Sequence, residues 1–411
     1  MQSPKYSILI PTRNGANYVL YAIKSILNHT YASVEVIVSV NHSSDDTLSV
    51  VSGIQDRRLT VIIPPEPLSM AKHYEWCLCH ANGEWVTILG DDDALLPWFF
   101  EVVDELLLKW ERKSIDAVSF RRVYYFWDGC QDVFDSVIDF AAQKKEHLIS
   151  GGLTILATLL GAKKHYDLPQ IYTNNIVKRQ CIINIKERCG GFFYHELTPD
   201  VYSGVAVALS ANRILRSEYP VFWTGTSPKS VGMAFSSRTN DQGQDIMFDG
   251  EKIRSEFLTL AEKDGLGISA AIDRAVWMTA QAGPIFVLSA LFKYPLLSEI
   301  WIRFRHYLIA LSFIEAKRQI RVRKKAKLSN VNELRDLMCN NLATLGIGRL
   351  RIAIAVMIIK AIRVWVFGIR IKSFVLRRAG LSKEVKYASN AHDQFPDIIC
   401  ANEFIDTFRN K

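Results

Sequence analysis

The chain lacks a long uninterrupted apolar run. Near the N-terminus a short run ends at Pro11, too early for the core of a signal peptide or for a membrane span. Further on, the longest run of the basic C-terminal segment, residues 352–359, has 8 residues, far below the ~20 that a transmembrane helix needs. We therefore expect a cytoplasmic protein whose membrane contact, if it has one, is peripheral and on the inner face of the cell membrane.

Two further absences narrow the class of protein. The 7 cysteines are odd in number and scattered, without the spacing of a metal site, which indicates reduced thiols rather than a disulfide scaffold. The glycine fingerprint of dinucleotide-binding enzymes is missing from the loops expected between strands and helices. Gly265, Gly267 and Ala270 follow a helical stretch at 251–264 instead of a strand. A nicotinamide-dependent oxidoreductase is thereby excluded.

Charge is distributed unevenly along the 411 residues. Residues 286–411 contain 23 Lys and Arg against 9 Asp and Glu, although the whole chain has a net charge of only +8. The remainder, residues 1–285, is therefore net acidic. A composition of 49% hydrophobic and 11% aromatic residues is enough for a well-packed core and for two domains. We expect the two parts to have different functions, with a boundary near residue 240.

The N-terminal part alternates between strand and helix patterns. β-branched apolar runs are typical of strands, and longer stretches with helical periodicity separate them. The expected strands are 6–10, 34–40, 59–63 and 85–89, and the expected helices are 18–28, 45–54, 70–81 and 98–110, with Ser43 or Ser44 as the cap of the second. Alternation of this kind predicts an α/β fold with a mostly parallel sheet.

An acidic triplet, Asp91, Asp92 and Asp93, follows the fourth expected strand. Ligands of α/β sheets lie beyond the carboxyl ends of the strands, so a divalent cation bridging a diphosphate would be held there. The plainer interpretation is a solvated loop that favours the following helix N-terminus. The neighbouring loops, at 11–15 and 40–46, offer amides, hydroxyls and carboxylates, a set that suits a nucleotide with its metal.

At this point the sequence resembles the family 2 glycosyltransferases of GT-A fold. The matching segments are SILIPTRNGANYVLYAIKSILNHTYASVEVIV, NHSSDDT and AKHYEWCLCHANGEWVTILGDDDALLP, followed by HELTPDVYSGVA and TGTSPKSVG. The resemblance implies a Rossmann-like catalytic domain over residues 1–240. It also implies transfer of a sugar from a nucleotide-sugar donor to an acceptor hydroxyl, with inversion, using Mg²⁺ or Mn²⁺ and one carboxylate as base.

Carried over by position, the resemblance assigns residues to the donor. The first loop, which lies along the nucleoside, would be Pro11, Thr12, Arg13 and Asn14. The second loop has Val40 and Asn41 where the family has an acidic residue that accepts from the base, so Asn41 is left to read the base edge through its amide. Lys72 and His73 match a pair on the third helix that faces the diphosphate.

The same comparison assigns the metal ligands and the base. Asp92 matches the ligating carboxylate, and Gly90 stands where the first acidic residue of the motif is usual. We therefore predict Asp92 and Asp93 as metal ligands and Asp91 as a donor contact. Asp200, after Pro199, matches the catalytic base. Additional candidates are Glu196 as an alternative base, His195 as a metal or acceptor contact, and a closing loop with Ser227, Lys229 and Ser230.

The C-terminal part, residues 241–411, is expected to be helical. Residues 349–378 mix long aliphatic side chains with a stripe of basic ones, and a second basic cluster at 318–327 follows an aromatic-rich pattern at 286–314. Such a stripe suits a helix lying on an anionic membrane surface, which would bring the enzyme to a saccharide or lipid-linked acceptor of a bacterial surface polysaccharide pathway. A solvated helical bundle is the plainer alternative.

Two other functions stay open from the sequence. The basic C-terminal part suggests nucleic-acid binding, although it lacks aromatic residues interleaved as a stacking platform, so we expect no nucleic acid. The departures at Val40 and Gly90 allow a glycosyltransferase-like protein that binds a donor without turning it over.

Overall fold

The computed structural model describes residues 3–130, 138–140, 143–159, 163–194, 198–234, 237–239, 245–247, 251–264, 287, 290, 385–387 and 395–409. The basic segments expected at 318–327 and 349–378 lie outside these ranges, as does nearly all of 286–314. Within the described residues, no helix combines the length and apolar character needed to cross a membrane.

The first four strand–helix units form as the sequence predicts. The strands are β1 (Tyr6–Thr12), β2 (Val34–Val40), β3 (Leu59–Ile62) and β4 (Trp85–Ile88), and the helices are α1 (Val19–Leu27), α2 (Thr47–Ser52), α3 (Met70–His80) and α4 (Phe99–Lys109). The expected cap of α2 is wrong. Asp46 is the cap residue, and the Asp45 carboxylate accepts from the backbone N–H of Thr47 at 3.1 Å.

An eight-stranded sheet runs through the molecule in the order β3-β2-β1-β4-β10-β6-β11-β9. β1 pairs in parallel with both β2 and β4, β2 with β3, and β6 with β11, whereas β10 and β9 are antiparallel to their neighbours. The added strands are β6 (Ala117–Phe120), β9 (Glu146–Ile149), β10 (Asn175–Lys178) and β11 (Ile214–Ser217). The predicted α/β fold with a mostly parallel sheet is confirmed.

The remaining elements form a second sheet and the outer helices. The second sheet has the order β15-β8-β7-β12-β5, from β5 (Ala94–Leu95), β7 (Val123–Phe126), β8 (Ile138–Phe140), β12 (Phe222–Thr226) and β15 (Val385–Tyr387). The outer elements are η1 (Glu111–Lys113), α5 (Gly151–Leu159), η2 (His165–Asp167), α6 (Arg179–Arg188), α7 (Pro199–Ser210), α8 (Val231–Ala234), the hairpin β13 (Ser237–Thr239) and β14 (Asp245–Met247), α9 (Glu251–Lys263) and α15 (Ile398–Arg409).

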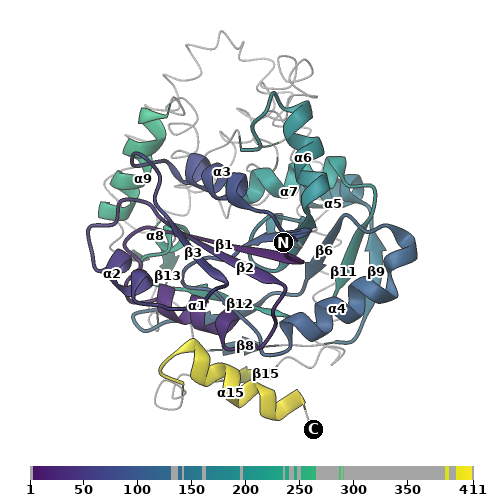
Figure 1. Ribbon diagram of the computed structural model, residues 1–411, viewed down its shortest axis with the longest axis horizontal. Helices are drawn as coiled ribbons and strands as arrows, with labels where there is room; N and C mark the ends of the chain where they lie inside the picture. Colours follow the sequence, from purple (N-terminus) through teal and green to yellow (C-terminus); the bar gives the residue numbers. More distant parts are fainter. Residues whose placement is uncertain are drawn as a thin grey trace.

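Helices cover both faces of the large sheet, because alternate strand residues point to opposite sides. Ile8 and Ile10 of β1 are buried with residues of α1, α4 and α15 in one core. Leu9 and Ile88 are buried in a second core with residues of α3, α6 and α7. Figure 1 shows the two helix layers, with α3, α6 and α7 above the sheet and α1, α4 and α15 below it.

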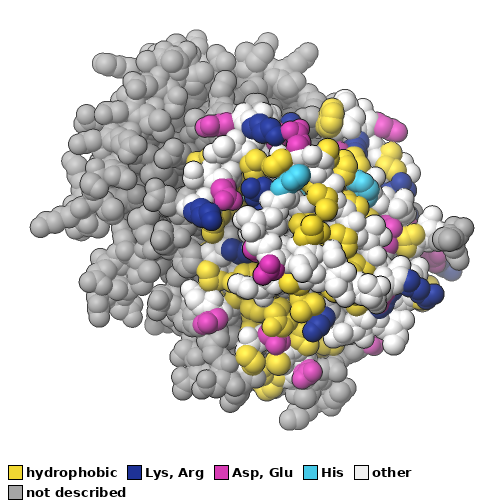
Figure 2. All heavy atoms as spheres, turned by 60° about the vertical axis from the view of Figure 1, so that its left-hand side comes forward, with side chains coloured by type: hydrophobic (Ala, Val, Ile, Leu, Met, Phe, Trp, Pro, Cys, Tyr) yellow, Lys and Arg dark blue, Asp and Glu magenta, His cyan; other side chains and the backbone are white. Residues whose placement is uncertain are grey.

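The described surface has no single-sign patch on the side that carries α2 and α9. Figure 2 shows Lys and Arg side chains interspersed there with Asp and Glu side chains. The charge asymmetry of the sequence therefore does not extend to this face. Most of the basic residues of the segment 286–411 lie outside the described ranges.

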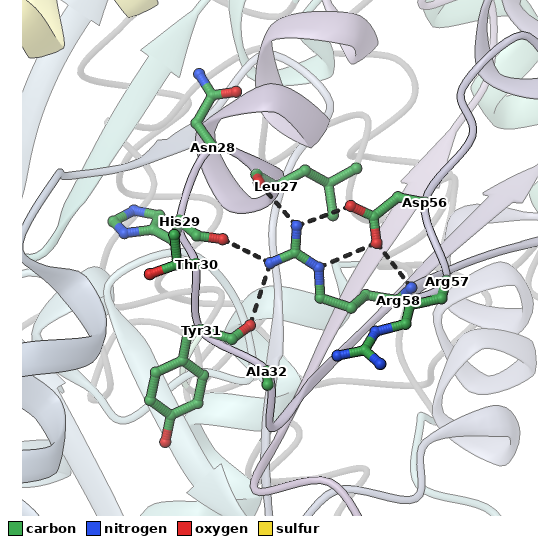
Figure 3. Close-up of a pocket in the computed structure, with 9 residues that line it drawn as sticks. All are labelled: Leu27, Asn28, His29, Thr30, Tyr31, Ala32, Asp56, Arg57 and Arg58. Carbon is green, nitrogen blue, oxygen red and sulfur yellow. Dashed lines mark hydrogen bonds and ion pairs between the residues drawn. The ribbon is translucent and has the colours of Figure 1, made fainter.

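A cavity of about 390 Å³ lies where α1 ends and β3 begins. Arg58 is one of the residues that line this cavity. Its guanidinium donates to the carbonyls of Leu27, His29 and Tyr31 at 2.6 to 3.1 Å and forms an ion pair with Asp56 at 2.8 Å (Figure 3). The last carbonyls of a helix have no partner within the helix, so Arg58 stabilises the end of α1. Because α1 runs back from the carboxyl end of β1, this cavity lies at the opposite edge of the sheet from the acidic triplet.

Candidate active site

The acidic triplet lies where parallel strands end side by side. Thr12 is aligned with Val40 at the ends of β1 and β2, and Leu9 of β1 is aligned with Ile88, the last residue of β4. Asp91, Asp92 and Asp93 follow directly and are each less than a tenth exposed. Three loops therefore meet at the edge where α/β proteins bind their ligands.

Asp93 turns into the protein. Its carboxylate accepts from the backbone N–H of Gly90 at 2.8 Å, from the backbone N–H of Gly225 at 2.7 Å and from the hydroxyl of Thr173. Burial, and then the charge of Asp92, raises the pKa of Asp93 to about 7. Because both carboxylate oxygens are used within the protein, this geometry gives no support to Asp93 as a metal ligand, and we regard it as the residue that joins the two loops.

The glycine at position 90 has a steric reason. A Cβ atom there would lie 2.5 Å from Oδ2 of Asp93 and 2.7 Å from the hydroxyl of Tyr172. Gly225 is confined in the same way, since a Cβ would lie 1.6 Å from the carbonyl oxygen of Asp92. Both distances are far below van der Waals contact. The departure from the family motif at Gly90 thus goes with the inward turn of Asp93.

Asp91 and Asp92 face the loop that follows β12. Asp92 Oδ2 accepts from the hydroxyls of Ser227 and Ser230, each at 2.6 Å, and Asp91 Oδ2 accepts from Thr12 and forms an ion pair with Lys229. Burial and the charge of Asp91 raise the pKa of Asp92. Ser227, Lys229 and Ser230 thus contact the acidic residues, and closure of their loop over a donor or acceptor stays a prediction.

The donor set at Asp91 and Asp92 fits a hard divalent cation. Mg²⁺ and Mn²⁺ prefer carboxylate, hydroxyl and water oxygens, and Mg²⁺ is usually held by one or two carboxylates together with substrate phosphates. The ammonium of Lys229 on Asp91 is a stand-in cation at this position. Among the described residues, no group of three or more acidic, His or Cys side chains is arranged to hold a metal ion.

The first loop is fastened to the second through Asn14, which has a left-handed backbone with φ 53°. The backbone N–H of Asn14 donates to Ser43 at 3.0 Å, and its side-chain oxygen accepts from the backbone N–H of Ser44 at 2.8 Å. Pro11 and Thr12 belong to β1 itself, where they pair with Ser39 and Val40. The two serines thus shape the first loop instead of capping α2.

Asn41 is buried, and both ends of its amide are used. Its Nδ2 donates to the carbonyl of Leu68 at 2.8 Å, and its Oδ1 accepts from the backbone N–H of Leu68 at 2.9 Å. The side chain therefore holds the segment that leads into α3. Its role in reading the base edge stays a prediction, and these contacts do not support it.

Lys72 and His73 of α3 have different surroundings. His73 is 4% exposed, its Nε2 lies 2.8 Å from Oγ of Ser39, and burial lowers its pKa to about 3. It is thus a neutral core residue, so these surroundings do not support a contact with the diphosphate, which stays a prediction for His73. Lys72 has a half-exposed side chain, and its ammonium lies 2.9 Å from Asp264, which also accepts from the backbone N–H of Ser69 at 3.0 Å.

The helix α9 approaches the same loops from outside. Glu256 of α9 lies 3.6 Å from the guanidinium of Arg13, which also donates to the carbonyl of Asn41 at 3.0 Å. Asp264, one residue beyond α9, contacts Lys72 as described above. Both cations that the sequence assigned to the donor, Arg13 and Lys72, are therefore paired with carboxylates of this segment.

Asp200 lies in the first turn of α7, as the sequence predicts, with Pro199 as the first helical residue. Burial raises its pKa, and the charge of Arg122 opposes this. Burial raises the pKa of Tyr172 and of Tyr74, and the negative charges of Asp93 and Asp200 both add to it; the two rings stack with centroids 6.3 Å apart. The two tyrosines thus place Asp200 in the same neighbourhood as the acidic triplet.

Some of these residues were missed from the sequence. Tyr172 and Thr173 stand directly before Asn174 and Asn175, a residue type that favours turns, and Asn174 does have a left-handed backbone with φ 82°. Trp127, whose indole N–H donates to the carbonyl of Asp92 at 2.8 Å, has no such signal. His195 and Glu196 lie outside the described residues.

Comparison with known proteins follows the same segments. A family model, described as "Glycosyl transferase family 2", matches residues 7–155 of this chain. An uncharacterized glycosyltransferase of Rickettsia typhi is 32% identical over 236 residues, which cover 54% of this chain and 71% of that protein. The chain belongs to glycosyl transferase family 2. The family that its motifs resemble is confirmed.

Two further relatives of this family 2 protein have names that state a reaction. One is the GalNAc(5)-diNAcBac-PP-undecaprenol beta-1,3-glucosyltransferase of Campylobacter jejuni, 41% identical over 96 residues, 23% of this chain and 31% of that protein. The other is the UDP-Glc:alpha-D-GlcNAc-diphosphoundecaprenol beta-1,3-glucosyltransferase WfgD of Escherichia coli, 28% identical over 103 residues, 25% of this chain and 41% of that protein. The chain spans less than half the length of either relative.

Proposed function

We propose that this protein is a glycosyltransferase that moves a sugar from a nucleotide-sugar donor to a hydroxyl of a saccharide carried on a lipid diphosphate. The observation that carries the proposal is the pair Asp91 and Asp92, buried side by side at the carboxyl edge of β4 and facing a loop that carries a cation. The names of the two glucosyltransferases support a lipid-linked acceptor of a bacterial surface polysaccharide or glycolipid.

In this proposal Asp91 and Asp92 would hold a Mg²⁺ or Mn²⁺ ion, which would neutralise negative charge on the nucleoside diphosphate leaving group. Asp91 takes the place that the sequence gave to Asp93, because Asp93 is engaged by Gly90, Gly225 and Thr173. The first loop, Pro11 to Asn14, lies beside the pair and would contact the nucleoside.

Asp200 is the proposed base. It removes the proton of the acceptor hydroxyl while the hydroxyl oxygen bonds to the anomeric carbon and the bond to the diphosphate breaks, so a single displacement inverts that carbon. Burial raises the pKa of Asp200, which makes it a stronger base than a solvated carboxylate. Asp200 and Asp93 both act on the pKa of Tyr172, which supports a base close to the acidic triplet.

The proposal is tested with purified protein, a panel of nucleotide sugars and Mn²⁺. We expect Asp92→Asn and Asp200→Asn each to slow the release of nucleoside diphosphate by about a hundredfold or more, because each removes a charge that acts in the transition state. Asp104→Asn is the matched control, since Asp104 is a partly buried carboxylate paired with Lys5 near the opposite end of β1. If every donor is consumed equally by the unmodified protein and by both variants, the proposed activity is refuted.

A further inference from the structure

Lys229 lies where three segments of the site meet. Its ammonium pairs with Oδ2 of Asp91 and lies 5.8 Å from the ring centroid of Tyr18. A Cβ atom on Gly15 would lie 3.0 Å from this ammonium and 2.4 Å from Asp91 Oδ2, so the first loop passes directly over the pair. Burial opposes ionisation of Asp45 in the second loop, but hydrogen bonds from Thr47 and Ala16 lower its pKa, and the charge of Lys229 adds to this effect. One cation thus faces both loops and the acidic triplet.

The charges at this point are not balanced without Lys229. Asp91 and Asp92 are neighbours in the chain and both are buried, and the described partners of the Asp92 carboxylate are two neutral hydroxyls, Ser227 and Ser230. Two buried carboxylates repel each other unless a cation lies between or beside them. Lys229 supplies that cation in the protein without ligands.

The loop that carries Lys229 is a compact turn. The backbone N–H of Ser230 donates to the carbonyl of Ser227 at 3.0 Å, and the backbone N–H of Ser227 donates to the hydroxyl of Ser230, also at 3.0 Å. The side chain of Lys229 is 22% exposed, and a lysine ammonium sits on a flexible stem with three donors. The ammonium is therefore able to change its partner without the turn coming apart.

We propose that Lys229 is an exchangeable counter-ion of the donor site: it pairs with Asp91 in the ligand-free protein and binds the donor's diphosphate once a divalent cation occupies Asp91 and Asp92. The proposal rests on the function proposed above and adds a donor-binding residue to it. A divalent cation at Asp91 repels the ammonium, and the diphosphate brings new negative charge to the same place.

This role has two consequences of opposite sign. Because Lys229 competes with the metal for Asp91, removing its charge strengthens the binding of the metal alone. Because Lys229 then binds the diphosphate, the same change weakens the binding of a nucleoside diphosphate in the presence of the metal. A residue that only supports the loop would weaken both.

The test uses Lys229→Gln in the full chain, with free Mn²⁺ followed by electron paramagnetic resonance and with UDP or GDP binding at saturating Mn²⁺ followed by calorimetry. We expect Mn²⁺ alone to bind about fivefold more tightly and the nucleoside diphosphate about fivefold more weakly, the size typical of one partly exposed ion pair. Lys229→Arg keeps the charge and should restore both affinities toward those of the unmodified protein.

Lys5→Gln is the matched control, because Lys5 forms a similar partly exposed pair with Asp104 at 2.7 Å near the other end of β1. It should change neither affinity. If Lys229→Gln changes both affinities in the same direction, or leaves Mn²⁺ binding unchanged, the counter-ion role is refuted. The glycosyltransferase function still stands in that case, provided that Asp92→Asn abolishes turnover. If the unmodified protein and Asp92→Asn bind Mn²⁺ equally and neither consumes a donor, both proposals fail.

Discussion

The pKa of Asp200 depends on opposing influences. Burial in the first turn of α7 raises it, whereas the backbone N–H of Val201 and then the positive charge of Arg122 lower it. Arg122 is held in place by Gln170, to which its guanidinium donates at 3.0 Å, and by the ring of Tyr166, whose centroid lies 4.9 Å away. Arg122 therefore acts as a positioning residue for the charge of the proposed base.

We predict that Arg122→Gln shifts the acidic limb of the pH–rate profile to higher pH. The base must be ionised, so activity is lost as the pH falls through the pKa of Asp200, and removing the Arg122 charge raises that pKa further. The profile of kcat against pH measures the shift. Arg122→Lys keeps the charge and should return the acidic limb to the pH of the unmodified protein. Arg213→Gln is the control and should leave the limb unchanged, because Arg213 donates instead to the carbonyl of Lys113. An unchanged limb in Arg122→Gln would refute the role of Arg122.

For single residues, the sequence predicts which residue types occupy the site better than it predicts the direction in which each side chain points. The acidic triplet is visible as a run of three carboxylates, but Asp93 turns inward because Gly90, Thr173 and Gly225 surround it, and two of these come from distant segments. Asn41 is likewise visible as a departure from the family, yet its amide is engaged by Leu68. Side-chain direction depends on tertiary neighbours that local pattern does not contain.

At the scale of elements, α15 holds together the two segments that flank the site. Its Ile398, Ala401 and Ile405 are buried in the core that contains α1 and α4. The side chain of Asn402 accepts from the indole N–H of Trp223 at 2.7 Å and donates to the carbonyl of Leu95 at 3.0 Å. Leu95 follows the acidic triplet and Trp223 precedes the Lys229 loop, so one amide links β5 to β12.

We predict that Asn402→Ala destabilises the protein by about 1 to 3 kcal/mol, because it removes the two buried hydrogen bonds that the Asn402 amide makes with the indole N–H of Trp223 and the carbonyl of Leu95. Denaturant unfolding measures this change in the free energy of unfolding. Glu403→Gln, at an exposed neighbouring position, is the control and should have little effect. A loss below about 0.5 kcal/mol, the size of an ordinary surface substitution, would mean that Asn402 does not link the two strands.

The elements differ in how far the sequence reveals them. The strands and helices of the first 110 residues are predictable from hydrophobic periodicity, because each strand is a short apolar run and each helix that follows has helical spacing of its apolar residues. The apolar spacing of Phe395, Ile398, Ala401 and Ile405 also fits a helix, but its partner strands lie far back in the chain. The expected boundary at residue 240 assigned this helix to a separate region, and local pattern gave no sign that it packs against the catalytic core.

At the scale of the whole molecule, net charge separates the two parts of the chain. Residues 286–411 have 23 Lys and Arg against 9 Asp and Glu, whereas the described face around α2 and α9 has both signs interspersed (Figure 2). A lipid-linked acceptor lies at a membrane, and the cytoplasmic leaflet is anionic. From the proposed function we predict that the basic part brings the donor site to the membrane surface.

We predict that the full chain floats with vesicles containing anionic phospholipid and not with neutral vesicles, and that salt releases it. Exchanging Arg363 and Arg370 for glutamine should weaken this binding by about tenfold or more, since each basic residue near an anionic surface contributes ~1 kcal/mol. Exchanging Lys144 and Lys145, which are exposed in the catalytic part, is the matched control and should leave flotation unchanged. Salt weakens the binding of a basic segment to any polyanion. If the protein still binds RNA at a salt concentration that abolishes flotation, nucleic acid is the preferred partner of the basic part and the membrane role is refuted.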